Sequence, residues 1–452
     1  NNIFDIYKQN FDVSEENKKK YGEVRTDYSL INKMLNLMPQ HLFENPELKW
    51  FDPCCGNGYF MIVLFHRLYI FLKTKINNSK LRKLHIIKNM LFMNEINSEH
   101  IPILKNIFGD HANIYNYNYF EMTNIKIDII VANPPFNYGV IKTPTNNNIS
   151  KKLDGKCVWQ KFIRQFIHQL DDYQHLLTII PSLWMKKYHS FNSFLTQFEI
   201  LKLHTMNNTE TNRIFHTQAQ TPTCYFHLQK KPTSEFINLY DQDYNKYIHF
   251  PIDINLPVHC SSIIKKMLPF IDIYGSIDIL KTNLDTGIRS KKTVISDVKT
   301  NFFAYTNIKT CYFKKNTMLL NLVYTNKPCN FYDIKKLIFA NKMYGLPQYD
   351  ITGKYGITTK DNYVIINKTH EQFLKIQKLF YTKTIIYILE STRYRMKNLD
   401  ISAFYYIPNI IDTIYYKNIN DKFLFKFFKF DSNQINIINN YYNSTEVPES
   451  LP

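Results

Sequence analysis

A short apolar run at residues 127–131 ends in a polar and aromatic tip, Asn133-Pro134-Pro135-Phe136. The run is typical of a buried strand, which cannot continue through two prolines because each proline lacks an N–H and fixes φ at about −65°. Asn133 precedes a proline and is itself restricted to extended geometry. We therefore expect a rigid tip that presents hydrogen-bond acceptors at a strand end. An ordinary turn at a strand end would also use these residues.

A second group of residues, Asp52-Pro53-Cys54-Cys55-Gly56-Asn57-Gly58, joins a short strand to an apolar helix. In doubly wound sheets, ligands bind outside the carboxyl ends of the strands, and glycines let the backbone come close to a ligand. The pattern predicts a cofactor pocket. Glu95 ends the next strand, where its carboxylate can accept both hydroxyls of a ribose, although it lies farther from Gly58 than the roughly 20 residues of dinucleotide folds.

The elements that must position these residues alternate between short apolar runs and stretches of helical period, which is typical of a doubly wound α/β sheet. The helices are expected at residues 59–73, 99–108 and 158–170. The strands are expected at 49–52, 91–94, 113–115, 127–131, 175–180, 200–203 and 224–228.

Charge and proline at residues 229–232 suit a linker, so we expect one domain at 1–232 and another at 233–452. The second half is irregular, basic and rich in tyrosine, with one clear helix at 371–381. Gly345, Gly353 and Gly356 lie close together there and indicate turns or a close backbone approach.

The motif Asp52-Pro53-x-x-Gly56-x-Gly58 resembles motif I of the N6-adenine DNA methyltransferases, which binds S-adenosylmethionine (AdoMet), and the tip at 133–136 resembles their motif IV. The segment from Tyr21 to Asp27 resembles motif X, which precedes motif I in the gamma group and holds the methionine end of AdoMet. The family usually has proline where this chain has Asp27. The resemblance covers residues 21–231 and implies a Rossmann-like sheet with helices on both faces, followed by an α+β target-recognition domain.

The resemblance also implies the residues of the cofactor site. Asn118 stands where the family commonly has an aspartate that bonds the cofactor adenine, and an amide oxygen can still accept that hydrogen bond. The expected AdoMet-binding residues are Tyr21, Thr26, Asp52, Pro53, Cys54, Gly56, Gly58, Glu95, Ile96, Asn118, Tyr119 and Asn133.

The tip suits the methylation of an aromatic amine. The lone pair of adenine N6 is delocalised into the ring, so this nitrogen is a poor nucleophile. Hydrogen bonds from N6 to the Asn133 side-chain oxygen and the Pro134 carbonyl would localise the lone pair and stabilise the positive charge that develops on N6. Pro135 keeps the corner stiff. This chemistry requires neither a general base nor a metal.

An adenine inside a duplex must be flipped out, at a cost of a few kcal/mol, into a pocket with stacking surfaces. Phe136 is expected to be one surface. The segment Asn212-Arg213-Ile214-Phe215 resembles motif VIII and makes Phe215 the second, although a core phenylalanine would also fit there. Pro181-Ser182 resembles the end of motif VI.

The formal net charge of +18 favours a polyanionic partner, here double-stranded DNA, although an A+T-rich genome would also enrich lysine. Residues 137–156 would either close over the flipped base or form a solvent-exposed loop. In the second half, cations interleave with an aromatic in a short basic segment. The expected DNA-binding residues are Lys151, Lys152, Arg393, Arg395 and Lys397.

Other classes fit the sequence less well. Seven cysteines without a Cys-x-x-Cys pair indicate neither a disulfide framework nor a thiolate metal site. The polar start carries no secretory signal, and the apolar stretch 61–72 is shorter than the roughly 20 residues that span a membrane. We expect an intracellular enzyme, in the cytoplasm or a nucleoid-like compartment. Motif X begins early in the chain, so we expect a modification enzyme without a nuclease region.

Two other functions remain open. Asn-Pro-Pro-aromatic tips also serve methyltransferases that act on RNA bases or on protein glutamine. A different class is a methyltransferase-like DNA-binding subunit that has lost the cofactor, which the departures at Asp27 and Asn118 would suit. The sequence does not decide the oligomeric state or the recognition sequence.

Overall fold

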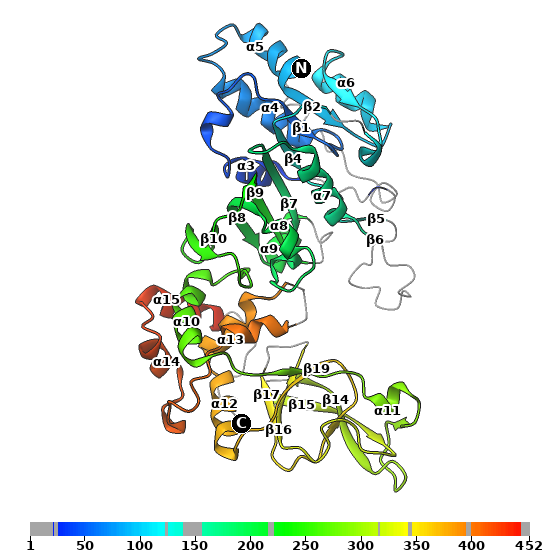
Figure 1. Ribbon diagram of the computed structural model, residues 1–452, viewed down its shortest axis with the longest axis vertical. Helices are drawn as coiled ribbons and strands as arrows, with labels where there is room; N and C mark the ends of the chain where they lie inside the picture. Colours follow the sequence, from blue (N-terminus) through cyan, green and yellow to red (C-terminus); the bar gives the residue numbers. More distant parts are fainter. Residues whose placement is uncertain are drawn as a thin grey trace. The chain divides into compact units, whose positions relative to one another are not determined.

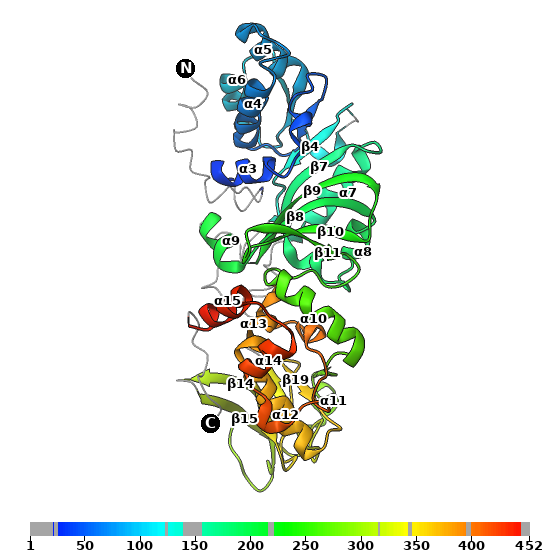
Figure 2. The same ribbon diagram turned by 90° about the vertical axis from the view of Figure 1, so that its left-hand side faces the viewer.

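The computed structural model describes residues 21, 26–122, 125–138, 156–215, 221–314, 317–341, 346–394 and 399–443. The chain divides into two compact units, each described by itself below (Figures 1 and 2). The first unit contains residues 1–240 and 247–256, and the second contains residues 241–246 and 257–452.

A mixed sheet forms the centre of the first unit. In the described residues it has nine strands, in the order β11-β10-β8-β9-β7-β4-β1-β2-β3. The strands are β1 (Trp50–Asp52), β2 (Leu91–Asn94), β3 (Asn113–Tyr115), β4 (Ile129–Ala132), β7 (His175–Pro181), β8 (Phe198–Met206), β9 (Thr223–Pro232), β10 (Phe236–Asp241) and β11 (Lys246–Pro251).

The strands β3, β2, β1, β4 and β7 are parallel neighbours. β9 runs antiparallel between β7 and β8, and β10 is parallel to β8. In β1, Phe51 pairs with Phe92 of β2 and with Ile130 of β4. The carboxyl ends of these three strands therefore meet at one edge of the sheet, where ligands bind in doubly wound folds.

Successive side chains of a strand point to opposite faces of the sheet, and both faces are covered. The Trp50 ring stacks on Phe43, and Trp50 belongs to the apolar core formed with α3 (Tyr28–Leu35), α4 (Tyr59–Phe71) and α6 (His100–Phe108). The next residue, Phe51, contacts Tyr119, which packs on Phe166 of α7 (Trp159–Gln169). Figure 2 shows α3, α4 and α6 on one side of the strands and α7 on the other. The predicted α/β sheet with helices on both faces is confirmed.

A basic insertion separates α4 from β2. It contains α5 (Ser79–His85), which begins after Asn78, whose side chain accepts hydrogen bonds from the N–H groups of Lys80 and Leu81. The Arg82 guanidinium donates to the carbonyls of Ile76 and Asn77 and lies 4.2 Å from the Tyr69 ring centroid. This insertion accounts for the long distance between Gly58 and Glu95.

The second unit combines two small sheets with helices, so the predicted α+β class is confirmed. The first sheet has the order β12-β19-β16-β17 and the second the order β13-β15-β14-β18. The strands are β12 (Leu280–Lys281), β13 (Ile295–Ser296), β14 (Tyr305–Lys314), β15 (Thr317–Thr325), β16 (Lys336–Ala340), β17 (Pro347–Asp350), β18 (Gly356–Ile357) and β19 (Asn362–Ile365). The helices include α10 (Ser261–Tyr274), α11 (Thr286–Arg289), α12 (His370–Phe380), α13 (Lys383–Ser391), α14 (Asp421–Phe427) and α15 (Ser432–Asn443).

The helix predicted at 371–381 is α12, which begins with a capping box. The Thr369 hydroxyl accepts from the Gln372 N–H, and the Gln372 side chain accepts from the Thr369 N–H. Within the described ranges, none of the helices has the length and apolar character that a membrane crossing requires.

Candidate active site

The loop after β1 is shaped by a buried carboxylate and a left-handed glycine. Asp52 Oδ1 accepts a hydrogen bond of 3.1 Å from the Cys54 N–H and turns the chain away from the strand. Gly58 has φ +81° and precedes the first residue of α4. A Cβ atom at Gly58 would lie 2.7 Å from Leu104 Cδ2 and 3.1 Å from the Phe108 ring. Backbone angle and helix packing therefore both require glycine at this position.

Glu95 ties the loop after β2 to the loop after β1. Its Oε2 accepts from the Gly56 N–H at 2.8 Å, and its Oε1 accepts from the Asn97 N–H at 2.8 Å. Each carboxylate oxygen has a second lone pair, so both can still accept from the hydroxyls of a ribose. The sequence predicts Glu95 at this strand end, and the structure brings it against the glycine loop.

Burial dominates the electrostatics of these two acids. Loss of solvent raises the pKa of Asp52 from 3.8 to about 8, with the nearby charge of Glu95 adding to the shift. Burial also raises the pKa of Glu95, against hydrogen bonds from backbone N–H groups. Two adjacent buried carboxyl groups favour a cationic ligand or one rich in hydroxyl groups, because such a ligand stabilises the ionised form.

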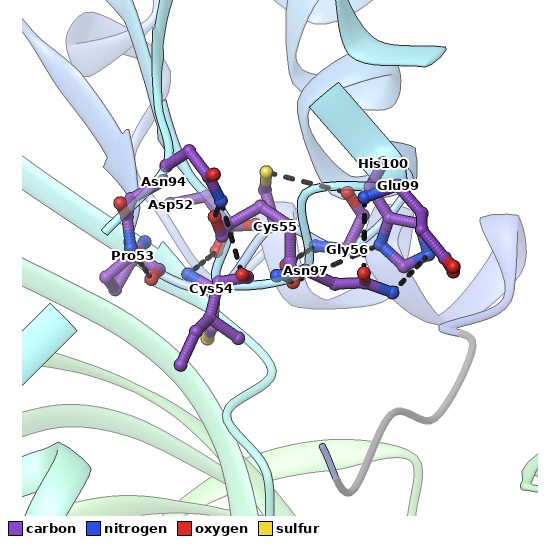
Figure 3. A network of polar contacts seen from close by, with 12 residues as sticks. Asp52, Pro53, Cys54, Cys55, Gly56, Asn94, Asn97, Glu99 and His100 are labelled. Atoms are coloured by element: carbon purple, nitrogen blue, oxygen red, sulfur yellow. Dashed lines mark hydrogen bonds and ion pairs between the residues drawn. The ribbon is translucent and has the colours of Figure 1, made fainter. Parts of the chain in front are cut away.

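Asn94 holds three strand-end loops together, a role that the motifs did not predict. Its Nδ2 donates to the carbonyls of Pro53 and Tyr117 at 3.1 Å each, and its Oδ1 accepts from the Tyr117 N–H. Figure 3 shows Asn94 beside Pro53 and Cys54, with Asn97 beside His100. A buried asparagine at the end of β2, directly before the acid Glu95, is the signal that would have indicated this role.

The segment after β3 carries the predicted adenine contacts. Asn118 Oδ1 accepts from the Phe120 N–H at 3.3 Å, and its Nδ2 donates to Glu121 Oε1, so this side chain caps the short helix Tyr119–Glu121. The Tyr119 hydroxyl donates to Gln169 Oε1 at 2.6 Å, and its ring stacks on Phe162. Tyr119 is therefore a buried support of this loop, whereas Ile96 is exposed. The cofactor contact of Asn118 stays a prediction.

The tip after β4 is held from two directions. Asn133 Nδ2 donates a hydrogen bond of 2.8 Å to the hydroxyl oxygen of the buried Thr26, just before α3. The Phe136 carbonyl accepts from the N–H groups of Val158 and Trp159 at the start of α7. Two residues predicted from separate motifs, Thr26 and Asn133, are thus brought together.

The two rings predicted to hold the target base contact each other. The Phe136 and Phe215 centroids are 6.3 Å apart, with their planes at 72°, in an edge-to-face arrangement. Phe215 is buried and belongs to the core on the side of α3 and α4, whereas Phe136 is half-buried. The structure therefore gives Phe215 a packing role and also places it beside the tip, and its contact with a base remains a prediction.

The roles of the remaining predicted residues stay predictions. Tyr21 is half-buried, and its role at the methionine end of AdoMet stays a prediction. Arg393 lies in the second unit, where its guanidinium pairs with Glu390. The remaining cations predicted to bind DNA lie outside the described residues, as does Gly345. These cations are Lys151, Lys152, Arg395 and Lys397.

The thiols of the loop after β1 are poor candidates for metal ligands. Burial, together with the charges of Asp52 and Glu95, raises the pKa values of Cys54 and Cys55 and keeps both protonated. Throughout the part of the chain that the structure describes, no group of three or more His, Cys, Asp or Glu residues could hold a metal ion.

The loops after β1, β2 and β4 lie at the carboxyl edge of a largely parallel sheet, which is where ligands bind in doubly wound folds. Residues 2–181 match the family model described as N-6 DNA Methylase. The resemblance to adenine methyltransferases predicted from the motifs is therefore confirmed over this segment.

Solved structures give similarities at low identity. A complex of the type IIL restriction-modification enzyme MmeI with DNA is 11% identical, with a TM-score of 0.46 over 97% of this chain and 78% of that chain. The M protein of the type I restriction enzyme EcoKI is 14% identical, with a TM-score of 0.35 over 47% of this chain and 48% of that chain.

A type I restriction-modification methyltransferase subunit from Streptococcus thermophilus is also 14% identical, with a TM-score of 0.31 over 50% of each chain. The chain thus spans about half the length of these two type I proteins. No curated protein matches the chain.

Proposed function

We propose that this protein transfers a methyl group from AdoMet to the N6 amine of an adenine in duplex DNA. The observation that carries the proposal is the hydrogen bond from Asn133 Nδ2 to Thr26 Oγ1. Because the amide nitrogen is engaged by Thr26, the amide oxygen of Asn133 is left to accept a hydrogen bond from a substrate amine. The Pro134 carbonyl supplies the second acceptor.

The chain's residues would act on the nucleophile. Two hydrogen bonds from N6 would draw it towards tetrahedral geometry, concentrate its lone pair and stabilise the charge that forms as the new N–C bond is made. AdoMet, when bound, supplies an electrophilic methyl group on a sulfonium and is left as a neutral thioether. The N6 proton then passes to solvent, so no general base is required of the chain.

The residues of the loops after β1 and β2 fit this cofactor. Asp52 and Glu95 are buried carboxyl groups, and a ribose diol or a cationic group matches both. Gly58 brings the backbone close without a side chain. β1 and β4 are neighbours in the sheet, so the carboxyl edge puts this loop next to the tip that begins at Asn133. Thr26, Asp52, Gly56, Gly58 and Glu95 are among the residues that we expect to bind AdoMet.

The target base is expected to stack on Phe136. Phe136 also contacts Phe215 edge-to-face, so a base that stacks on the same side of the Phe136 ring would have to displace this contact. Such a contact is worth about 0.5–1.5 kcal/mol, less than the binding energy that two hydrogen bonds and stacking supply. The formal charge of +18 and the family match support DNA as the substrate.

The test is methyl transfer from labelled AdoMet to duplex DNA, RNA and a protein extract, assayed in parallel. We expect label in DNA, recovered as N6-methyldeoxyadenosine after digestion to nucleosides. Label found only in RNA or only in protein would show that the substrate is that molecule and not DNA. Absence of both label transfer and AdoMet binding would favour a non-catalytic subunit.

A further inference from the structure

Three loops of the second unit, at residues 285–293, 326–335 and 350–360, converge on two buried acids. Asp285 is the first of these. Its Oδ1 accepts from the N–H groups of Gly287 and Ile288 at the start of α11, and its Oδ2 accepts from the Asn330 N–H at 2.9 Å. One buried side chain thus fixes the first loop and joins it to the second.

Asp350 and Lys336 join the second loop to the third. Lys336 Nζ donates to the carbonyls of Phe331 and Ile334 at 2.9 Å each, and to Asp350 Oδ2 at 2.7 Å. The side chains of Lys336 and Asp350 are 0% and 1% exposed, and the same Asp350 oxygen accepts from the Tyr355 N–H. All three ammonium hydrogens are used. Such a pair adds little net stability but strongly disfavours other loop conformations.

The backbone of these loops is held in unusual conformations. Lys291, Phe331 and Asp333 have φ values of 60°, 64° and 59°, and Gly353 has 74°. A left-handed conformation costs a non-glycine residue about 1–2 kcal/mol. A Cβ atom at Gly353 would lie 2.8 Å from the Ile334 nitrogen, so the second and third loops touch through their backbones. Strain of this kind is retained where a surface must keep one shape.

The outer surface of the three loops is strongly basic. Among their residues, all of which the structure describes, Asp333 is the one exposed acid, because Asp285 and Asp350 are buried. Ile334 and Ile351 are 39% and 49% exposed. The exposed cations are Arg289, Lys291, Lys292, Lys327, Lys335, Lys354 and Lys360.

We propose that these three loops form the surface by which the second unit grips duplex DNA and reads its bases, an inference that rests on the proposed function. Phosphate contacts require cations, and lysines on pre-shaped loops lose little backbone freedom on binding. Base readout requires groups that reach the groove, and exposed isoleucines can contact the methyl group of thymine. Figure 1 shows α11, at the start of the first loop, at the outer side of β14.

The first test removes charge. A variant with Lys291→Gln, Lys292→Gln and Lys354→Gln is compared with a control that carries Lys265→Gln, Lys417→Gln and Lys422→Gln, exposed lysines elsewhere in the same unit. The same charge is removed from both variants. The probe is a random-sequence DNA duplex, and its Kd is measured over a range of salt concentrations.

Removing one lysine that binds a phosphate reduces the slope of log Kd against log salt by about 0.9. The slope of the loop variant should therefore fall by most of three such units, and its DNA binding should be at least tenfold weaker, while the control keeps the wild-type slope. Equal slopes for the two variants would overturn the proposal. Weaker binding to an RNA duplex without weaker binding to DNA would also overturn it, because the surface would then serve RNA.

The second test concerns base readout. Ile334→Ala with Ile351→Ala should keep the salt slope and relax the sequence preference in a library of duplexes methylated by the enzyme. An unchanged preference would show that these loops do not read bases. The DNA-binding measurement does not depend on methyl transfer. If the loop variant loses salt slope but the wild-type protein does not methylate N6, the proposed function alone is refuted. If the wild-type protein methylates N6 but the loop variant binds DNA as the control does, this inference alone is refuted.

Discussion

The side-chain amide of Asn133 donates to the hydroxyl of Thr26 across 2.8 Å and 107 positions of the chain. This bond joins the tip of β4 to the segment in front of α3, two regions that carry separate motifs. The amide of an asparagine can present either its oxygen or its nitrogen to a substrate. A partner on the nitrogen side favours the orientation in which the oxygen faces the substrate amine.

Thr26 is therefore expected to act as a positioning residue for Asn133. Thr26→Val keeps the shape of the side chain but removes the acceptor, and should lower the single-turnover rate about tenfold, the effect of one ordinary hydrogen bond. Thr26→Ser should keep most of the rate. In an Asn133→Ala background, Thr26→Val should cause little further loss of rate. Equal losses with and without Asn133 would contradict the positioning role.

Gly58 and Gly109 form a matched pair for the cofactor loop. Both have positive φ values, +81° and +84°, with ψ 13° at Gly58 and ψ 169° at Gly109. A Cβ at Gly109 meets nothing within 4 Å, whereas one at Gly58 overlaps Leu104. Gly109→Ala should cost about 1–3 kcal/mol of stability and leave AdoMet affinity unchanged. Gly58→Ala should cost more and weaken AdoMet binding at least tenfold, with partial recovery in a Gly58→Ala, Leu104→Ala double variant. Equal effects of the two glycine substitutions, measured by urea unfolding and calorimetry, would contradict this account.

AdoMet binding should release a proton from Asp52. The pKa of Asp52 is raised to about 8 by burial, so the carboxyl group is protonated in the free protein at neutral pH. A bound cationic cofactor favours the carboxylate and lowers this pKa. The binding heat at neutral pH should then depend on the ionisation enthalpy of the buffer, and affinity should rise with pH up to about 8. Asp52→Asn should abolish the buffer dependence, and a wild-type heat that is the same in every buffer would refute this prediction.

The same shift has a consequence for the free protein. A carboxyl group with a raised pKa keeps its proton in the folded state while the unfolded chain loses it. The contribution of Asp52 to stability is therefore lost as the pH rises from about 4 to about 8. Bound AdoMet should reduce this loss.

A histidine pair at the amino end of β7, formed by His175 and by His227 of the neighbouring strand β9, should make the stability of the fold sensitive to acid. His227 Nε2 and His175 Nδ1 lie 3.0 Å apart, and burial lowers the pKa of His227 to about 3 and that of His175 to about 4. Below the unfolded value of 6.5, the unfolded chain binds protons that the folded chain does not, so stability is lost as the pH falls towards 4.

His227→Gln should reduce this pH dependence of unfolding by about one proton. Urea unfolding at several pH values measures it, and His111→Gln, which replaces an exposed histidine, is the matched control. The prediction fails if His227→Gln and wild type show the same proton uptake on unfolding.

Strands with strong apolar runs could be predicted closely from the sequence. β2 and β3 have the predicted bounds, and β4 lies at Ile129–Ala132 against the predicted 127–131. β8 and β9 extend beyond their predicted bounds because charged residues, Glu199 in β8 and Lys230 and Lys231 in β9, occupy half-buried positions at their ends. Residues 229–232, interpreted as a linker, form the end of β9, where the chain can carry charge and proline near a register shift.

The edge strands β10 and β11 and the sheets of the second unit were not predicted, because polar and charged residues such as Asn238 in β10 and Lys309 in β14 interrupt their apolar runs. Site residues could be predicted from the sequence where they lie within one short motif, as in the tip at 133–136 and the loop that contains Gly58. It was not predictable where side chains join distant segments. Asn94, Asp285 and Lys336 each stabilise loops through contacts that no local spacing reveals.

The most direct test of the central claim is the single-turnover rate of Asn133→Ala on duplex DNA, read as N6-methyldeoxyadenosine, together with its AdoMet affinity. The account predicts AdoMet binding close to wild type and a rate lower by at least about 10²-fold, the scale of removing one electrostatic stabiliser. A rate that survives the substitution, with the cofactor bound as before, would contradict the role of Asn133 in activating the amine.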